Sequence, residues 1–426
     1  MCNLLSIHKN VICHSSKNKS QQEQKDISFE IFNSVNDFSG SEWNKIAGAK
    51  FFLHYHYLKV IEISKPAGIT FRYVLIYKNK ILSAISCFQV ADLSSKELGS
   101  LINLENSGRI LSSVGNKINR VLFSTNKYAA NNLLVCGNLF VSGEYGIACA
   151  DEMFMPVVVN SLSEITEKIS QQISETNGRV ICYAVKDFYD TEDIYVKELI
   201  KEKFHRMVID PNMIFSVRKN WKKFEDYLND MSSKYRLRAN NVLKKISDVE
   251  IRNLEPGEME KEKKAVENLY LQVQKKAPVR IIRVDVNYFL TLKKYLKEKF
   301  VFRAFYLNGK MIAFTTGFKQ GSHYEAHFIG IDYHHNKSHA LYQNILYDFI
   351  HEAIKNKSEQ LVFGRTAMEI KSTVGATAYP LYSYIKLSNT FLNKIIKPFI
   401  PSEENENWIP RKPFKEEVGN TNDGII

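Results

Sequence analysis

The chain has 426 residues, of which 44% are hydrophobic and 24% charged, a composition typical of a globular protein with more than one core. Its net charge of +12, from 58 basic and 46 acidic residues, favours an anionic partner such as phosphate, nucleic acid or a lipid headgroup. The length of the chain predicts two domains. The sequence has no apolar run long enough to span a membrane and no secretory signal, so we expect a cytoplasmic protein.

All six cysteines lie in the first half of the chain, and none is paired at the spacing of a zinc site. We therefore expect reduced, mostly buried thiols. The motifs HExxH, CxxC and GxSxG and the Walker loop are also missing. The sequence thus predicts no bound metal and no tightly bound cofactor.

Both ends of the chain are polar. The first 27 residues are rich in Lys, Ser and Gln and predict a mobile tail, and residues 401–426 predict a second polar tail. Between them we expect an N-terminal domain over residues 28–205 and a C-terminal domain over residues 206–400. The final strand of the second domain is a candidate for packing on the first.

Two similar hairpins are predicted far apart in the chain. In the first half, a helix at residues 51–64 precedes a hairpin at 71–89, and a helix at 161–177 precedes another apolar strand. The second hairpin spans residues 302–319 and has Asn-Gly at its turn. Both hairpins begin with Phe-Arg, place Lys directly after the turn and end in Phe followed by a polar residue. This echo suggests an internal duplication.

The second half of the chain has clear patterns for helices and strands. Two basic helices are predicted within residues 220–246, and further helices at 256–277 and 287–300. After the hairpin, a strand at 323–332 leads into a helix at 334–357. Either Asn336 or Ser338 can cap the start of that helix.

The last elements carry distinctive charges. The strand that ends in "LVFG" leads into a short helix closed by Gly375, and a final strand follows. Thr366 and Glu369 fit the capping box S/T-x-x-E, in which each side chain accepts from a backbone donor at the helix start. Arg365 and Lys371 are then left without a local structural role.

Three segments together carry a family resemblance: "FFLHYHYLKVIE" near the front, the basic "SSKYRLRANNVLKK", and "FGRTAMEIKSTVGA". They resemble the GNAT N-acyltransferase superfamily, and within it the branch of the Fem peptidoglycan-bridge aminoacyltransferases and related predicted N-acyltransferases. The third segment is similar to the branch's C-terminal pattern of FGR, a short gap, a Lys and a Gly. The resemblance spans residues 51–385. It implies an α/β fold of two tandem GNAT-like domains, each a twisted mixed sheet flanked by helices.

One position departs from the wider superfamily. Acetyl-CoA-using members carry a Gly-rich turn before the central helix, where backbone N–H groups approach pyrophosphate. This chain has "HHNKSHA" there, with no glycine. Fem-type enzymes also lack the turn and take their acyl group from aminoacyl-tRNA, so coenzyme A is in doubt as the donor. Asn336, Lys337 and Ser338 nevertheless remain candidates for holding phosphate.

The resemblance and the residue types together indicate a site for acyl transfer. Lys371 matches the family's functional lysine, whose ammonium could stabilise an oxyanion or hold a phosphate. Arg365 can bind a carboxylate or phosphate through two parallel hydrogen bonds, the alternative being a salt bridge with Glu369. Glu325 and His327 alternate onto one face of their predicted strand, where either could accept the amine's proton.

By resemblance, the basic helix faces the acceptor substrate, and Fem acceptors carry a diphosphate. The alternative is a solvated helix face. The candidate contacts in this helix are Lys234, Tyr235, Arg236 and Arg238.

The sequence thus predicts an N-acyltransferase that moves an activated acyl or aminoacyl group to an amine of a phosphate-bearing cell-envelope precursor or lipid. The donor would be aminoacyl-tRNA, acyl-CoA or acyl-carrier protein, with tRNA and the membrane surface as candidate partners. One alternative is acylation of an amino acid or amino sugar with acyl-CoA or acyl-carrier protein as donor. The other is a non-catalytic module that binds nucleic acid or another anionic ligand.

Overall fold

The computed structural model describes residues 13–14, 27–93, 130–176, 178–189, 194–276, 281–402 and 408–415. Most of the predicted N-terminal tail lies outside these residues. The chain forms two compact units. The first contains residues 1–209, 277–296 and 380–404, and the second contains residues 210–276, 297–379 and 405–426.

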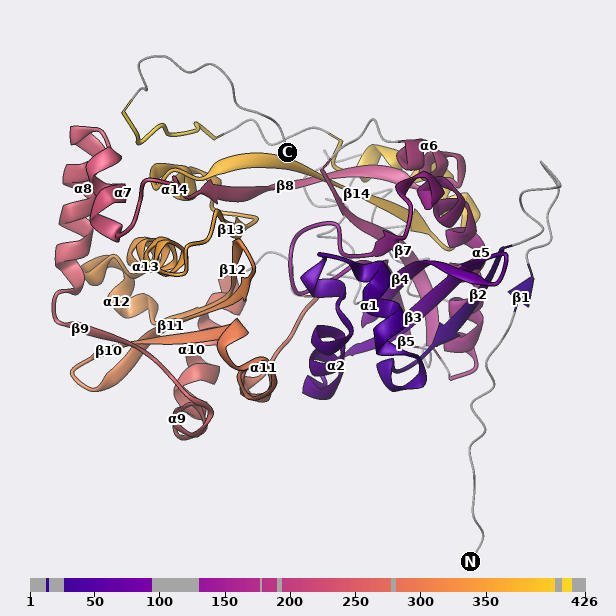
Figure 1. Cartoon of the computed structure of the whole chain (residues 1–426), viewed down its shortest axis with the longest axis horizontal. Helices are drawn as coiled ribbons and strands as arrows, with labels where there is room; N and C mark the ends of the chain where they lie inside the picture. Colours follow the sequence, from indigo (N-terminus) through magenta and orange to yellow (C-terminus); the bar gives the residue numbers. More distant parts are fainter. Residues whose placement is uncertain are drawn as a thin grey trace, which may run out of the picture. The chain divides into compact units, whose positions relative to one another are not determined.

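The first unit is a mixed sheet flanked by helices (Figure 1). Its strands follow the order β1–β2–β3–β4–β5–β7–β14, and β6 pairs with β4. The strands are β1 Cys13–His14, β2 Ile27–Phe32, β3 Ile69–Lys78, β4 Ile81–Asp92, β5 Ala130–Cys136, β6 Ile147–Cys149, β7 Gly178–Phe188 and β14 Thr377–Leu387. The helices are α1 Gly40–Ala47, α2 Tyr55–Ser64, α5 Met155–Ser174, α6 Ile194–Lys201, α11 Val286–Leu296 and α15 Thr390–Ile395.

Two apolar cores cover the two faces of this sheet. Leu134 of β5 packs in the core beneath α5, whereas its neighbour Leu133 packs in the core beneath α15. Successive side chains of a strand point to opposite faces, so the two cores lie on opposite sides of the sheet. The long helix α5 contributes Val158, Leu162 and Ile165 at helical spacing, all of them buried.

The second unit is also a mixed sheet, with the strand order β9–β10–β11–β12–β13–β8. Helix α13 packs on one face, where Phe349 contacts Tyr324, and α10 packs on the sheet through Tyr270 and Phe328 (Figure 1). The strands are β8 His205–Ser216, β9 Val249–Asn253, β10 Phe300–Leu307, β11 Lys310–Gln320, β12 His323–Ile331 and β13 Gln360–Gly364. The helices are α7 Phe224–Asp230, α8 Ser233–Leu243, α9 Pro256–Lys261, α10 Lys263–Lys276, α12 Tyr333–His339, α13 Leu341–Lys355 and α14 Met368–Thr373.

Both predicted hairpins are confirmed. Their turn residues, Asn79 and Lys80 in one and Asn308 and Gly309 in the other, all have positive φ, between 50° and 74°. This is the turn geometry that matches the twist of paired strands. Each ladder also has an irregularity at the same distance from its turn, after Ile76 in β3 and after Phe305 in β10. The shared turn and bulge support the predicted duplication.

Strands β8 and β14 each pair with a strand that does not directly precede them in the sequence. Strand β8 follows β7 in sequence but pairs with β13, from Ser216 opposite Gln360 to Met213 opposite Gly364. Strand β14 follows β13 in sequence but pairs with β7, ending with Leu387 opposite Cys182. Each sheet is therefore completed by a strand that follows the other sheet along the chain.

Three expectations about secondary structure are corrected. The helix predicted at 334–357 is two helices, α12 and α13, because Ala340 between them has a left-handed φ of 45°. The helix predicted at 256–277 is likewise split at Glu262 into α9 and α10. The tail predicted at the C-terminus is in part packed against the second unit, where the ring of Phe414 contacts Phe215, Trp221 and Tyr227.

The four described cysteines are free, and three of them are buried. Burial raises the pKa of Cys182 to about 12, which makes its thiol unreactive. Within the described ranges, no group of three or more His, Cys, Asp or Glu residues lies close enough to hold a metal ion. None of the described helices combines the length and the apolar character that crossing a bilayer needs.

Candidate active site

The two sheets differ at one pair of parallel strands. In the first unit, β5 and β7 pair from Ala130 to Cys136 along the whole of β5. In the second unit, β12 and β13 pair only from His323 to Glu325, although β12 continues to Ile331. The second pair therefore separates after Glu325. We refer to this separation of the two strands as the opening between β12 and β13.

A β-bulge in β12 lies directly after the point of separation. The ladder with β11 joins Gly317 to Ala326 and then Thr315 to Ile329, so Thr316 faces two residues of β12. The hydroxyl of Thr316 donates to the carbonyl of Phe328 at 2.8 Å and accepts from its N–H at 2.9 Å. One side chain thus fixes the backbone of the bulge.

The two candidate proton acceptors, Glu325 and His327, are both on strand β12, close to the point where it separates from β13. Glu325 is buried, and it is the last residue of β12 that pairs with β13. The His327 ring lies among aromatic rings, with centroids 4.8 Å from Phe318 and 4.4 Å from Phe328. Burial lowers the pKa of His327 to about 3, so its imidazole is neutral at neutral pH. A group with so low a pKa is a weak general base.

Lys371 is buried, with 4% of its surface exposed. Its Nζ donates to the carbonyl oxygens of Phe363 at 3.0 Å, Gly364 at 3.0 Å and Arg365 at 2.6 Å. The pKa of Lys371 is lowered to about 7, chiefly by burial; the charge of Asp210 opposes this shift and the charge of Arg365 adds to it. All three protons of the ammonium form are therefore committed to the end of β13 and the loop that follows.

That loop has an unusual backbone. Gly364, Thr366 and Ala367 have φ values of 71°, 66° and 50°. Glycine adopts such angles freely, but a β-branched residue such as Thr366 rarely does, and each strained residue costs about 1–3 kcal/mol. The three hydrogen bonds from the Lys371 ammonium group to carbonyl oxygens of the loop offset this strain.

The predicted capping box at this loop is wrong. The residue before α14 is Ala367, and no side chain caps the helix start. Glu369 instead pairs with Arg411 of the C-terminal segment. The predicted closure by Gly375 is confirmed, since its φ is 106° and its N–H donates to the carbonyl of Ser372.

Arg365 remains the unexplained cation of the loop. Its side chain is half-buried, and no hydrogen bond or ion pair joins its guanidinium to the described part of the chain. The alternative of a salt bridge with Glu369 is not observed, because that carboxylate pairs with Arg411. Arg365 is thus placed beside the opening between β12 and β13 with its hydrogen-bond donors available.

In the segment predicted to hold the donor's phosphate, a side chain of the protein already occupies one backbone donor. The side-chain oxygen of Asn336 accepts from the N–H of Tyr342 at 3.0 Å, which confirms it as a cap of α13. Ser338 instead donates to the carbonyl of His335. Lys337 is exposed on α12. The segment before α13 is therefore the short helix α12, whose Asn336 accepts from a backbone donor at the start of α13.

The predicted basic helix is α8. Lys234 and Arg238 are exposed and Tyr235 and Arg236 half-buried, and the Arg238 guanidinium lies 5.7 Å from the Tyr235 ring centroid. The C-terminal segment joins α14 to the start of α8. Arg411 pairs with Glu369 of α14, and the Ser232 N–H donates to the carbonyl of Pro413.

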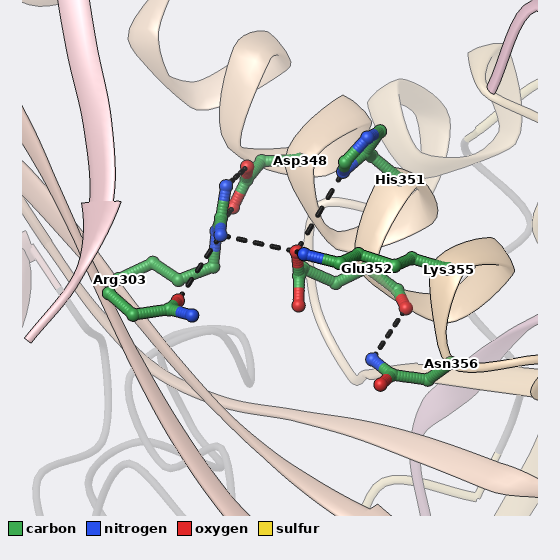
Figure 2. A network of polar contacts seen from close by, with 7 residues as sticks. Arg303, Asp348, His351, Glu352, Lys355 and Asn356 are labelled. Carbon is green, nitrogen blue, oxygen red and sulfur yellow. Dashed lines mark hydrogen bonds and ion pairs between the residues drawn. The ribbon is translucent and has the colours of Figure 1, made fainter. Parts of the chain in front are cut away.

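A buried ion network, which sequence analysis did not anticipate, joins β10 to α13. Figure 2 shows Arg303 pointing toward Asp348 and Glu352. The guanidinium makes two 2.8 Å hydrogen bonds to Asp348, and a further nitrogen lies 3.1 Å from Glu352. Burial raises the pKa of Asp348, although Arg303 opposes this. The available signal was two acids at i, i+4 spacing within an apolar helix face.

The fold places the chain in a structural class: it has an α/β fold of the FemX type. The crystal structure of FemX has a TM-score of 0.50 and 9% identity, over 84% of this chain and 98% of that chain. A tandem GNAT protein from the clavulanic acid biosynthesis pathway matches with a TM-score of 0.49 and 7% identity, over 85% of this chain and 98% of that chain. L-PGS from Bacillus licheniformis matches with a TM-score of 0.42 and 9% identity, over 80% of this chain and 89% of that chain. No protein-family model matches the chain, and neither does any curated protein.

Proposed function

We propose that the protein is an N-acyltransferase that moves an activated acyl or aminoacyl group to an amine of a phosphate-bearing cell-envelope precursor or lipid. The observation that carries this proposal is the separation of β12 from β13 beside Arg365, which has no counterpart in the fully paired β5 and β7. The FemX likeness supports the fold that this activity needs.

The reaction would be direct attack by the amine. A neutral amine adds to the carbonyl carbon of the donor ester or thioester, a C–N bond forms, and the C–O or C–S bond of the donor breaks. The amine nitrogen loses one proton, and the leaving oxygen or sulfur gains one. Glu325, the last residue of β12 that pairs with β13, is the proposed proton acceptor. The low pKa of His327 makes its imidazole a poor proton acceptor.

Arg365 is proposed to bind a phosphate or carboxylate of one substrate. A guanidinium can make two parallel hydrogen bonds to such a group. Lys371 is proposed as a positioning residue, since its ammonium protons already bond the carbonyl groups of the Arg365 loop. The basic residues of α8 are proposed to contact the acceptor.

We favour aminoacyl-tRNA over acyl-CoA as the donor. Asn336 accepts from the N–H of Tyr342, one of the groups that would otherwise meet a pyrophosphate at the helix start. Acyl-CoA and acyl-carrier protein are separate arms of the test.

The test incubates the purified protein with cell-envelope extract and one donor at a time: charged tRNA, acyl-CoA or acyl-carrier protein. Acylated products are identified by mass. We expect a product with charged tRNA, and a kcat/KM at least about tenfold lower for Arg365→Gln, because a charge-assisted bidentate contact is lost. Lys310→Gln, an exposed lysine on the same unit, is the matched control. Failure of every donor, or an unchanged kcat/KM in Arg365→Gln, would refute the proposal.

A further inference from the structure

Helix α14 is too short to be stable without contacts to the rest of the chain. It has six residues, Met368–Thr373, and no side chain caps its start. Isolated helices shorter than about 12–15 residues are marginal in water, so α14 depends on tertiary contacts. Lys371 joins the helix to the loop before it. A second support comes from residues 408–415, which we call the C-terminal segment.

Arg411 joins the C-terminal segment to α14. Its backbone N–H donates to the hydroxyl of Ser372 at 3.0 Å, and its guanidinium pairs with Glu369. Ser372 is buried, and its hydroxyl donates to the carbonyl of Glu369 at 2.7 Å. The segment thus contacts two residues of the helix, one through its backbone and one through a side chain.

The ring of Phe414 packs between α7 and the residue that closes α14. Its centroid lies 5.6 Å from the ring centroid of Trp221 and 5.9 Å from that of Tyr227. The Arg218 guanidinium lies 4.8 Å from the same ring. On the other side the ring lies against Gly375, where a Cβ would overlap it. The absence of a side chain at Gly375 therefore makes room for Phe414.

Backbone hydrogen bonds on both sides of Phe414 hold it in place. The N–H of Ser232 donates to the carbonyl of Pro413 at 2.9 Å. The N–H of Lys415 donates to the carbonyl of Asp230 at 3.1 Å. Asp230 ends α7, and Ser232 directly precedes α8. The C-terminal segment therefore connects α14 to the link between α7 and α8, all within the second unit.

We propose that the C-terminal segment positions Arg365 for the transfer reaction, and that this depends on Phe414. The contacts are continuous. Phe414 packs on the end of α14, α14 carries Lys371, and the Lys371 ammonium donates to the carbonyl of Arg365 at 2.6 Å. Because Phe414 acts through Lys371, it is a positioning residue. The inference rests on the proposed function, in which Arg365 binds a phosphate or carboxylate.

Hydrogen exchange tests the support of α14 without any substrate. The amides of Lys371, Gly375 and Ala376 donate hydrogen bonds within α14 and its closing turn. In the full-length variant Phe414→Ala, we expect these amides to exchange at least about tenfold faster, because the helix opens locally more often. The amides of α13 should keep their wild-type rates. The matched control is Ile409→Ala, which shortens a 64% exposed apolar side chain of the same segment.

Three results of this measurement would overturn the proposal. They are unchanged exchange in Phe414→Ala, equal acceleration in the Ile409→Ala control, and acceleration spread evenly over α13 and α14. The last would show a general loss of stability. If Phe414→Ala does not fold, Phe414→Leu takes its place, with an expected acceleration of at least about threefold because part of the apolar contact remains.

The second measurement is kcat/KM in the product assay. Phe414→Ala should lower it at least about fivefold. Combined with Arg365→Gln, it should cause no further loss, because both changes act on the same guanidinium. Additive losses would overturn the positioning role. If no donor gives a product, the proposed function fails, whereas the hydrogen-exchange result needs no substrate and still decides whether the C-terminal segment supports α14.

Discussion

Lys371 places an amine inside the second unit, where carbonyl oxygens replace the water that would otherwise surround it. Burial disfavours the charged form, whereas the carbonyl groups favour it. The position of Arg365 depends on this balance, because its own carbonyl is one of the three partners. The lysine therefore links the ionisation of one buried group to the shape of the proposed site.

Stability should depend on pH through Lys371. Its folded-state pKa of about 7 lies below the ordinary value of 10.5, so between these values the unfolded chain binds the additional proton. The stability that this residue contributes is thus fully present above pH 10.5 and is lost as the pH falls toward 7. We expect the free energy of unfolding of the wild type, relative to Lys371→Met, to rise by roughly a few kcal/mol across this window.

Urea denaturation of both proteins across that pH range provides the measurement. A difference that stays constant with pH would show that the carbonyl groups keep the amine protonated in the folded state.

Asp348 is a buried charge with a charged partner, Arg303, whereas the partners of Lys371 are neutral carbonyl groups. Asp348→Asn should lower the free energy of unfolding by about 3–5 kcal/mol, because it leaves the buried Arg303 without its bidentate partner. Chemical denaturation measures this. Glu258→Gln is the control, since Glu258 pairs with Arg252 at the surface and its loss should have little effect. Equal losses in the two variants would contradict the argument.

At the scale of elements, the bulge in β12 and the loop after β13 shape the two sides of the strand opening. Each depends on one polar side chain, Thr316 for the bulge and Lys371 for the loop. Both side chains bond to backbone groups, so each determines the local geometry of the backbone. The opening is thus set by polar contacts that an apolar pattern does not reveal.

Thr316→Val should destabilise the bulge. The substitution keeps the side-chain shape but removes two hydrogen bonds to Phe328, with an expected loss of about 1–3 kcal/mol. Transfer activity should fall with it, and Thr316→Ser should restore most of both. Chemical denaturation measures the stability of each variant, and the product assay measures its transfer activity. Wild-type activity in Thr316→Val would show that the bulge has no part in the proposed site.

At the scale of the whole molecule, the exchanged strands make each unit depend on the other's stretch of chain. The first unit needs β14, whose Tyr384 and Ile385 lie in its two cores. A chain truncated after Ala376 should therefore leave the first unit with an unpaired β7 edge and without α15. We expect loss of its cooperative unfolding and early proteolysis within residues 130–188. A truncated chain in which that region stays protease-resistant would argue against this dependence.

Local patterns predicted most elements correctly. The hairpins follow from turn residues and alternating apolar side chains within about 20 residues. The helix α13 follows from its apolar stripe, and Gly375 from the need for a positive φ at a helix end. In each case the cause lies within a few residues of its effect. The fold class was implied by the family resemblance, and the FemX likeness supports it.

Local reasoning failed where a distant residue decided the outcome. The capping box matched its motif, but Glu369 bonds to Arg411, 42 residues away, and Lys371 holds the loop in another conformation. Both hairpins contain Phe-Arg, but these residues are not equivalent: when the two turns are superposed, Phe71 corresponds to Phe300 and not to Phe302.

The sequence alone determined the two similar hairpins and singled out Arg365 and Lys371 as charges that helix capping does not explain. Both conclusions rest on residue types and spacing within short segments. Only the tertiary structure decided which strands complete each sheet, where β12 and β13 separate, and that Lys371 is buried against three carbonyl groups. These depend on pairing between segments far apart in sequence, which no local pattern specifies.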